Sequence, residues 1–247
     1  MSENNYFQFS NSVIVVPLLV TLCIWIVFFI EIHFGINWNQ YGIYPRTFTG
    51  LRGIIFSPFI HGSAQHLYNN TVPLFVLTTA ICYFYKNIAF KIVFFGILIS
   101  GFLTWCIGRE SYHIGASGLI YVLASFVFFK GIFTKYYRLV ALSLLVVFVY
   151  GSMLWYIFPV KDDISWEGHL SGFVVGLLFA YFLKTPVLVV KKYDWQREDY
   201  NEDEDEFLRH FDEQGNFIEN TPEINSEQNS DIIITYEYKE NKNTKSE

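Results

Sequence analysis

Long apolar stretches alternate with short polar breaks over the first three quarters of the chain. A helix must span about 30 Å of hydrocarbon to cross a bilayer, and six of these stretches are long enough to do so. They are Val13–Ile30, Leu67–Tyr85, Ile88–Gly108, Gly115–Lys130, Arg138–Phe158 and Gly168–Leu183. This pattern predicts an all-α polytopic membrane protein with six packed helices. The first stretch has no basic segment before it and no small-residue cleavage site after it, so we expect a retained helix and not a signal peptide.

The break between the first two stretches, residues 31–65, is longer than the others and different in kind. It is rich in glycine, proline, aromatic residues and asparagine, which makes it too interrupted to span and too apolar for a plain solvated loop. Irregular backbone is tolerated at membrane depth when it packs in protein or lines a cavity. We therefore expect a partly immersed, re-entrant or interfacial element between the first and second helices.

Composition supports the membrane assignment and divides the chain in two. Of the 247 residues, 52% are hydrophobic and 20% aromatic, which exceeds what a soluble domain of this length needs. Residues 1–193 carry 12 Lys/Arg and 6 Asp/Glu, a net charge of +6, whereas residues 194–247 carry 5 and 17, a net charge of −12. A segment this acidic and polar cannot bury enough apolar surface to fold alone. We expect a six-helix domain over 1–193 and a disordered cytosolic tail over 194–247, whose partner is unknown.

Basic residues near the ends of the apolar stretches predict the orientation, because they concentrate on the cytoplasmic side. Eight fall on one side of the expected membrane: Lys86, Lys91, Lys130, Lys135, Arg138, Lys184, Lys191 and Lys192. Four fall on the other: Arg46, Arg52, Arg109 and Lys161. This bias places both termini in the cytoplasm. The second, fourth and sixth helices then begin at the outer face.

Four polar side chains stand where those three helices begin. His66 and Asn70 open the second helix, Ser117 opens the fourth and His169 opens the sixth. Polar groups inside a bilayer are costly and usually mark a functional site. At 1.5 Å per residue above Lys130, Ser117 lies ~10 Å below the outer surface, and His169 reaches nearly the same depth. The four groups are therefore expected to converge in one submerged cavity.

The chemistry of these groups favours a serine protease. Serine becomes a nucleophile when a neighbouring base takes its proton, and His169 is the candidate base for Ser117. His66, Asn70 and the backbone N–H of Ser117 can donate hydrogen bonds to an oxyanion. No carboxylate is placed to complete a triad, because Glu167 is two residues from His169 and points away. The sequence therefore predicts a Ser–His dyad that hydrolyses peptide bonds within the membrane, behind walls formed by Arg109–Ile114 and Pro159–Trp166.

Small and aromatic residues support the same pairing of helices. Gly172 and Gly176 share the helical face of His169 and allow a close approach of the fourth and sixth helices. Tyr121, one turn below Ser117, is placed to pack against the imidazole of His169. Taken singly, each motif has a plainer interpretation: Gly115-Ala116-Ser117-Gly118 arises by chance, and His66 with Asn70 can bond neighbouring helices.

The remaining histidines are less specific. His61 has two interpretations, a residue that lines the cavity and binds water or a cap for the second helix. His113 and His33 are expected at the interface. His61 and His66 are about 140° apart on a helix, a poor arrangement for a shared metal ion, so no metal site is predicted.

Three blocks together resemble the rhomboid family of intramembrane serine proteases. They are His61-x4-His66-x3-Asn70, Gly115-x-Ser117-Gly118-x2-Tyr121 and His169-x2-Gly172-x3-Gly176, and the resemblance covers about residues 40–185. It implies a Ser117–His169 dyad, an oxyanion hole that includes His66 and Asn70, and a histidine stacked on Tyr121.

The resemblance also implies substrates and a location. The family cuts single-pass membrane proteins near small-residue sites that weaken the helix, without a cofactor. The expected partners are transmembrane substrates and the lipid bilayer, not nucleic acid. The expected location is a bacterial cytoplasmic membrane, with the active site opening to the outer side. The Trp-Arg pair that many members carry in the first loop is absent here.

Two other functions are compatible with parts of the pattern. A catalytically silent rhomboid-like adaptor would bind transmembrane helices but would not need both Ser117 and His169. A small-solute transporter would need internal repeats or intramembrane charge pairs, and the sequence has neither. For the protease, a substrate must enter sideways, so we expect Arg138–Phe158 and the cap Pro159–Trp166 to be held less firmly than the other helices.

Overall fold

The structure, a computed structural model, describes residues 10–149, 155–184, 193, 195, 197–205 and 207–218. The chain divides into two compact units, Met1–Val189 and Val190–Glu247. Within the described residues the regular structure is helical, with seven α-helices, and the only β-pairing is two isolated bridges. The prediction of an all-α protein is confirmed.

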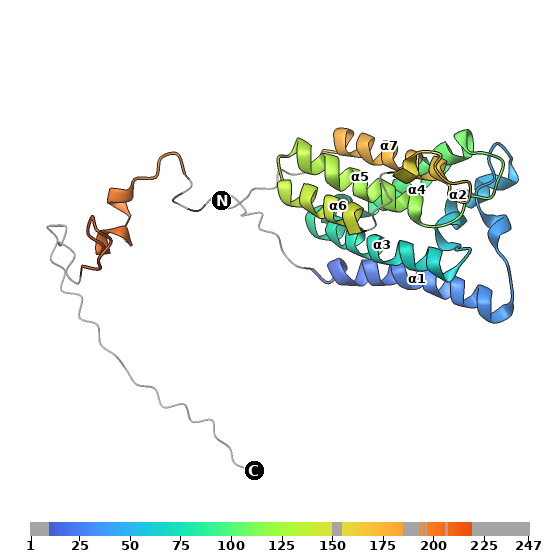
Figure 1. The fold of residues 1–247 in the computed structure, drawn as a ribbon, viewed down its shortest axis with the longest axis horizontal. Helices are drawn as coiled ribbons and strands as arrows, with labels where there is room; N and C mark the ends of the chain where they lie inside the picture. Colours follow the sequence, from blue (N-terminus) through green and yellow to red (C-terminus); the bar gives the residue numbers. More distant parts are fainter. Residues whose placement is uncertain are drawn as a thin grey trace, which may run out of the picture. The chain divides into compact units, whose positions relative to one another are not determined.

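The first unit is a bundle of long helices with one short helical turn beside it (Figure 1). The long helices are α1 (Ser12–Phe34), α3 (Ala64–Phe84), α4 (Lys86–Ile107), α5 (Ser117–Phe133), α6 (Tyr137–Val149) and α7 (Trp166–Phe182). The short one is α2 (Gly53–Phe56). Each predicted apolar stretch overlaps one long helix. The fifth differs most: α6 ends at Val149, residues 150–154 lie outside the described part, and Trp155–Ile157 forms a separate 3-10 turn.

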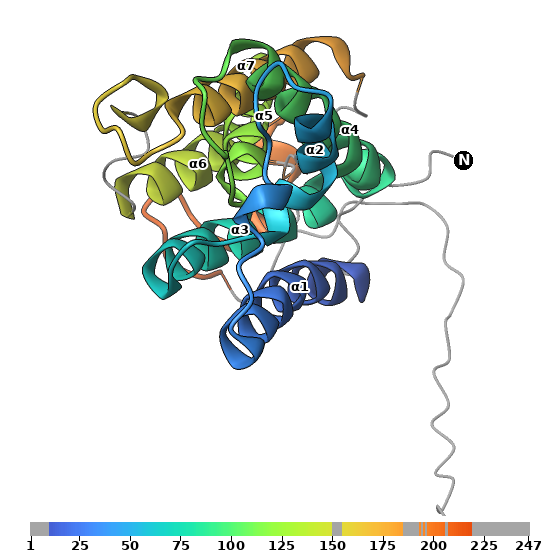
Figure 2. The same ribbon diagram turned by 90° about the vertical axis from the view of Figure 1, so that its right-hand side faces the viewer.

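Helix α5 forms the centre of the bundle. It packs against α3, α4, α6 and α7, and its contact with α7 is the most extensive between any two elements. Viewed along the bundle, α5 lies among these neighbours, while α1 packs at the edge against α3 (Figure 2). Because α5 is surrounded, most of its residues from Leu119 to Val127 are buried. A helix that is apolar on every side is typical of a buried position.

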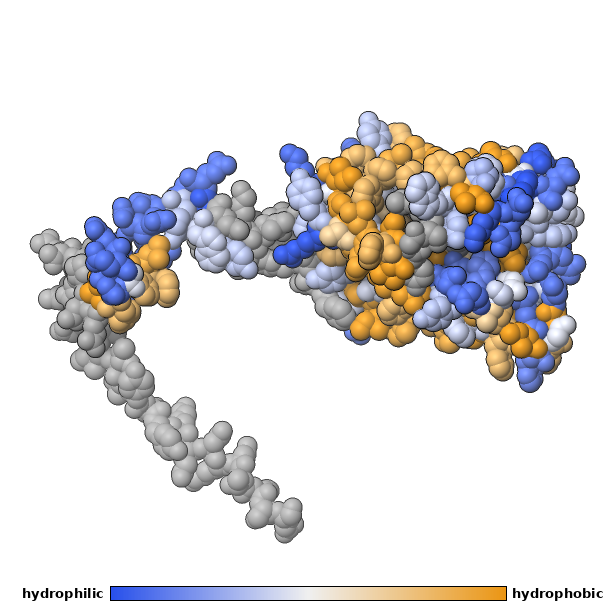
Figure 3. Space-filling model, viewed as in Figure 1, coloured by the Kyte–Doolittle hydropathy of each residue, from blue (hydrophilic) through white to orange (hydrophobic). Residues whose placement is uncertain are grey.

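The outside of the bundle is apolar as well. On α1, large side chains such as Phe29 and Ile32 are 64% and 65% exposed. Apolar residues cover much of the visible face of the helical unit, and hydrophilic ones gather at the end that carries α2 (Figure 3). By length and composition, α1 and α4 are long and apolar enough to cross a membrane. A soluble monomer rarely exposes apolar surface on this scale, so these helices indicate a membrane protein.

The connection between α1 and α3 is anchored to the end of α4. The Arg46 guanidinium donates to the carbonyl of Gly108 at 2.6 Å, and the Trp105 indole donates to the carbonyl of Thr47 at 2.9 Å. The connection contains α2 and three 3-10 turns, Asn39–Tyr41, Thr49–Arg52 and Ser57–Phe59. Arg46 and Trp105 therefore secure this loop in a chain that lacks the Trp-Arg pair.

At the other end of the bundle, the buried Lys130 of α5 binds the last turn of α7. Its ammonium group donates to the carbonyls of Ala180 at 3.1 Å and Leu183 at 2.6 Å. The last carbonyls of a helix have no partner within the helix, and they carry the negative end of its dipole. Lys130 satisfies both the hydrogen bonds and the charge.

The second unit contains only short turns where it is described. Glu202–Glu204 and Leu208–His210 are 3-10 turns, and Phe211 pairs with Phe217 in an isolated bridge. The tail segment 219–247 lies outside the described residues, so disorder over 194–247 stays a prediction.

Candidate active site

A cavity of about 1010 Å³ opens among α3, α5, α7 and the loops that precede α5 and α7. Ser117 and His169 both line it, and so do His66, Asn70 and Tyr121. These five residues come from three helices and from positions as far apart in the chain as 66 and 169. The fold thus brings them around one cavity.

Ser117 is the first residue of α5, and the backbone before it follows an unusual path. Gly115 has a φ of 105°, a region that side chains disfavour and glycine accepts. The Gly115 N–H donates to the carbonyl of Ser57 at 2.8 Å, which fixes this turn against the α1–α3 connection. Glycine at this position lets the chain turn sharply and present the Ser117 side chain at the start of the helix.

His169 lies in the first turn of α7, close to Ser117. The Ser117 Oγ and His169 Nε2 are 2.9 Å apart, within hydrogen-bond distance. His169 Nδ1 lies 2.9 Å from the carbonyl oxygen of Tyr156. A carbonyl only accepts, so Nδ1 carries the hydrogen, and Nε2 is left with the lone pair that accepts from the Ser117 hydroxyl. This tautomer is the one that a general base for Ser117 requires.

The imidazole of His169 also packs against an aromatic ring. The rings of Tyr121 and His169 are stacked, with centroids 4.4 Å apart and planes 16° apart. The carboxylate of Glu167 lies elsewhere: it accepts from the Arg109 N–H at 3.1 Å. The ring is therefore positioned by the Tyr156 carbonyl and the Tyr121 ring.

His66 and Asn70 reach the loop before Ser117 from α3. A Cβ atom built on Gly115 would lie 2.5 Å from His66 Nε2 and 3.7 Å from Asn70 Nδ2, so both side chains end beside this glycine. The Asn70 amide donates one hydrogen to the carbonyl of His66 at 3.0 Å. An amide group has two hydrogens, and the second is available to a ligand. The N–H of Ser117 belongs to the first turn of α5, where backbone donors have no partner within the helix.

Of the two interpretations of His61, the helix cap belongs to another residue, and binding of water by His61 stays a prediction. Ser63 caps α3, because its hydroxyl accepts from the His66 N–H at 3.1 Å. His61 is 3% exposed, borders neither of the two cavities, and packs edge-on against the His66 ring with centroids 5.0 Å apart. Burial, followed by the neighbouring His66, lowers the pKa of His61 to about 4.

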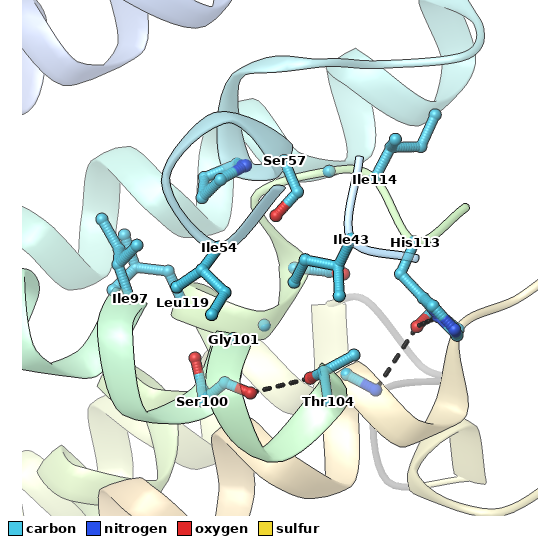
Figure 4. A pocket seen from close by; sticks show the side chains of 16 residues that line it. Ile43, Ile54, Ser57, Ile97, Ser100, Gly101, Thr104, His113, Ile114 and Leu119 are labelled. Atoms are coloured by element: carbon cyan, nitrogen blue, oxygen red, sulfur yellow. Dashed lines mark hydrogen bonds between the residues drawn. The ribbon is translucent and has the colours of Figure 1, made fainter. Parts of the chain in front are cut away.

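A second, smaller cavity of about 40 Å³ lies next to Ser117 (Figure 4). The hydroxyl-bearing residues Ser57, Ser100 and Thr104 line it, together with apolar side chains. A polar cavity can hold a water molecule once it offers roughly 10–15 Å³ to the probe. This cavity is large enough to hold water beside the serine.

His113, which was expected at the membrane interface, is buried within the protein and bonded to two loops. It is 4% exposed, and its ring lies 2.5 Å from Ser165 Oγ through Nδ1 and 3.1 Å from the Arg109 carbonyl through Nε2. Its partner Ser165 is 52 residues away in the chain, so the local sequence could not reveal the contact. Burial lowers the pKa of His113 below its usual value.

Glycines bring α5 and α7 into contact. A Cβ atom on Gly172 would collide with the Gly118 carbonyl, and one on Gly176 would collide with the Val122 carbonyl. A Cβ on Gly118 would meet its nearest neighbour, the Gly168 carbonyl, at an ordinary 3.5 Å. The backbones of the two helices therefore touch directly, which allows the first residues of α5 and α7 to lie within hydrogen-bond distance.

Two contributors to the site were missed by sequence reasoning. Tyr156 acts through its main-chain oxygen, which leaves no signal in residue type. Ser165 caps α7 by accepting from the Gly168 N–H at 3.3 Å. A serine just before an apolar stretch, with the acidic Glu167 in the first turn, is a helix-start signal that could have identified it. Among the described residues, no group of three His, Cys, Asp or Glu side chains could hold a metal ion.

Comparison with known proteins gives one family and several uncharacterized relatives. The family signature described as the Rhomboid domain matches residues 49–186. The chain is 37% identical over 159 residues to the uncharacterized proteins Mb1372 of Mycobacterium bovis and Rv1337 of Mycobacterium tuberculosis. That match covers 59% of this chain and 64% of each relative. The uncharacterized protein ML1171 of Mycobacterium leprae is 34% identical over 145 residues, 55% of this chain and 57% of the relative. The chain thus spans less than two thirds of these relatives.

Proposed function

Because this chain belongs to the rhomboid family, we propose that it is an intramembrane serine endopeptidase in which Ser117 and His169 form a catalytic dyad. The observation that carries the proposal is the 2.9 Å contact between Ser117 Oγ and His169 Nε2, with the opposite ring nitrogen bonded to the Tyr156 carbonyl. This arrangement orients a neutral imidazole to accept the serine proton. General-base assistance of this kind is worth typically 10²–10⁴-fold in rate.

The first half of the reaction forms an acyl-enzyme. Ser117 Oγ attacks the carbonyl carbon of the substrate while His169 Nε2 takes the hydroxyl proton. The carbonyl oxygen becomes an oxyanion, and the donors within reach are His66, the free Asn70 N–H and the Ser117 N–H. The C–N bond then breaks, His169 returns its proton to the leaving amine, and the acyl group remains on Ser117. Losing one oxyanion donor costs about 10²–10³-fold in kcat in other serine proteases.

The second half consumes water, which the small cavity beside Ser117 can supply. A water molecule gives a proton to His169 Nε2 and attacks the acyl carbon. The second oxyanion collapses, the ester bond to Ser117 breaks, and His169 returns the proton to Ser117 Oγ. The hydroxyls of Ser57, Ser100 and Thr104 make the cavity polar enough to hold that water.

We further propose that the six long helices span a bacterial cytoplasmic membrane with both termini in the cytoplasm. The apolar exterior of the bundle and the excess of basic residues on one side support this orientation. The cavity then opens to the outer side, below the membrane surface. The acidic segment 194–247 becomes a cytosolic tail that follows the catalytic domain 1–193.

A transmembrane substrate reaches Ser117 between α3 and α6. Tyr68 and Pro73 of α3 line one side of the large cavity, and Val149 at the end of α6 lines the other. Within the described residues α6 packs extensively on α5, whereas α6 and α3 form no contact of comparable extent. The substrates in this proposal are single-pass membrane proteins whose helix is weakened near small residues.

Labelling with a fluorophosphonate probe tests the proposal without a known substrate. We expect the wild type in detergent to be labelled at Ser117, Ser117→Ala to be unlabelled, and His169→Ala to be labelled at least 10²-fold more slowly. Ser143→Ala removes another buried hydroxyl, one that bonds its own helix, and serves as the matched control that labels normally.

The result that contradicts the protease is equally specific. If the wild type stays unlabelled under conditions that label an active rhomboid protease, the catalytically silent adaptor takes its place. That adaptor would bind transmembrane helices in the same cavity without cutting them.

A further inference from the structure

We infer that His113 is a positioning residue: it ties the loop before Ser117 to the cap of the helix that carries His169. The inference rests on the dyad proposed above and adds what sets its geometry. Ser117 and His169 stand at the first turns of α5 and α7, so their relative position depends on the two irregular loops that enter those helices. His113 lies in the first of these loops and contacts the second.

The backbone of His113 is fixed on one side. Its N–H donates to the Ile43 carbonyl at 2.9 Å, and its carbonyl accepts from the Ile43 N–H at 3.0 Å. This two-bond bridge secures the loop before α5 to the connection between α1 and α3. Two residues later, the Gly115 N–H bonds the Ser57 carbonyl in the same connection. The loop is thus held against a rigid partner immediately before Ser117.

The ring of His113 reaches across to α7. Nε2 lies 3.1 Å from the Arg109 carbonyl, and Nδ1 lies 2.5 Å from Ser165 Oγ. The carbonyl accepts, so Nε2 carries the hydrogen and Nδ1 accepts from the Ser165 hydroxyl. The same hydroxyl oxygen accepts from the Gly168 N–H, one residue before His169. Figure 4 shows the His113 ring at the edge of the small cavity.

A second link runs parallel to the first and uses charged groups. Arg109 donates its backbone N–H to Glu167 at 3.1 Å and its guanidinium to the Ile164 carbonyl at 2.5 Å. Glu167 is 1% exposed, and Arg109 Nε lies 3.7 Å from its carboxylate. Arg109 and Glu167 are also the charged groups that face His113. Burial favours the neutral ring, in which Nε2 donates to the Arg109 carbonyl and Nδ1 accepts from the Ser165 hydroxyl.

Misplacement of catalytic groups by about 1 Å can cost 10²-fold in rate. The close packing of α5 and α7 fixes the distance between the helix axes, but it leaves the first turn of each helix dependent on its entering loop. The link through His113 removes that freedom. His113 and Ser165 also border the large cavity, but the ring bonds join two protein loops, so we expect their loss to lower kcat more than it changes KM.

Kinetics on a membrane substrate tests the inference through the split between kcat and KM. We expect His113→Phe to lower kcat tenfold or more with KM within about twofold, since phenylalanine fills the site but makes neither bond. This variant keeps Ser165 and the cap of α7, so its loss cannot come from capping. Ser165→Ala should lower kcat by a similar factor, and Ser165→Thr should keep most of the wild-type kcat. The double variant His113→Phe/Ser165→Ala should have a kcat no lower than that of the less active single variant.

Ser125→Ala is the matched control. Its hydroxyl donates to the Phe173 carbonyl at 2.7 Å, so it also joins α5 to α7, but eight residues from Ser117. We expect its kcat within about twofold of the wild type. If His113→Phe loses no more activity than Ser125→Ala, or if the effects at His113 and Ser165 simply multiply, the inference is overturned.

A readout that needs no turnover separates this inference from the proposed function. The ¹⁵N signals of the His169 ring should move in His113→Phe and stay in place in Ser125→Ala. An unlabelled, inactive wild type would overturn the protease, whereas the ring signals would still decide the positioning role. An active wild type whose His169 signals ignore His113→Phe would overturn the positioning role alone.

Discussion

At the scale of single residues, Gly115 combines two requirements at one position. Its φ of 105° needs glycine, and the space where a Cβ would stand is taken by the His66 ring. The backbone path to Ser117 and the placement of His66, a proposed oxyanion donor, therefore both depend on the absence of a side chain at this position. The backbone next to the proposed nucleophile therefore has no room for a methyl group.

Gly115→Ala should consequently damage activity much more than the fold. The new methyl group would lie 2.5 Å from His66 Nε2, so we expect the rate of fluorophosphonate labelling of Ser117 to fall about 10²-fold or more. Gly62→Ala is the matched change, because its Cβ meets only the Ile114 side chain, at 3.5 Å. It should label within about threefold of the wild type. Equal labelling rates for the two variants would contradict this account.

The sequence predicted the side chains of the candidate site better than the main-chain groups that bond to them. Ser117, His169, His66 and Asn70 stand out because polar residues are rare in apolar helices and because their spacing places them at helix starts. The role of the Tyr156 carbonyl was not predictable, since any residue type offers the same oxygen.

Histidines in loops were the least predictable part of the site. His113 was expected at the interface and is buried, because its partners lie in the α1–α3 connection and at the start of α7. Such contacts depend on how loops that are distant in the sequence fold over one another. Neither the periodicity of hydrophobic residues nor the spacing of motifs predicts that arrangement. The same limit applies after α6, where the apolar stretch predicted a helix through Phe158 and Trp155–Ile157 instead forms a 3-10 turn.

At the scale of helices, α5 and α7 form the most extensive pair in the bundle, whereas α6 has one main partner within the described residues. Glycine contacts and the Lys130 bonds hold α5 against α7, whereas α6 depends on its packing against α5. Val149 of α6 and several residues of α3 border the large cavity. The proposed substrate entry between α3 and α6 would therefore leave the α5–α7 pair in place.

A covalent tether between α3 and α6 should block the proposed entry of a transmembrane substrate without affecting the reactivity of Ser117. In a protein whose Cys23, Cys82 and Cys106 are replaced by serine, Tyr68→Cys and Val149→Cys introduce two thiols. A flexible bifunctional reagent can then join these thiols. We expect the tethered protein to lose cleavage of a transmembrane substrate at least tenfold, because the wall can no longer open. Labelling of Ser117 by a small fluorophosphonate should stay within about twofold. Unchanged cleavage in the tethered protein would count against this route.

At the scale of the whole molecule, two histidines buried in loops couple stability to pH. Burial lowers the pKa of His113, and burial together with His66 lowers that of His61 to about 4. Each is neutral when folded and free to take a proton at its usual pKa of 6.5 when unfolded. Their contribution to stability is complete above that pH and is lost as the pH falls, because the unfolded chain then binds more protons.

Thermal unfolding in detergent should show this dependence. We expect Tm to fall steadily from about pH 7 to about pH 4.5, and the slope to be smaller in His113→Phe than in the wild type. The tail carboxylates Asp199, Asp205 and Asp212 do not interfere, because hydrogen bonds hold each pKa below 3.8. A Tm that stays level or rises toward acid would contradict the assignment of neutral buried histidines.

The ammonium group of Lys130 gives the bundle a property beyond stability. It bonds the C-terminal end of α7 to α5, while the Ser117–His169 contact joins the N-terminal ends of the two helices. The two helices are therefore linked at both ends. In the proposed protease, substitutions that change which substrates enter would fall on α3 and α6, away from this secured pair. The proposed dyad would then keep its geometry while substrate choice changes from one protein to another.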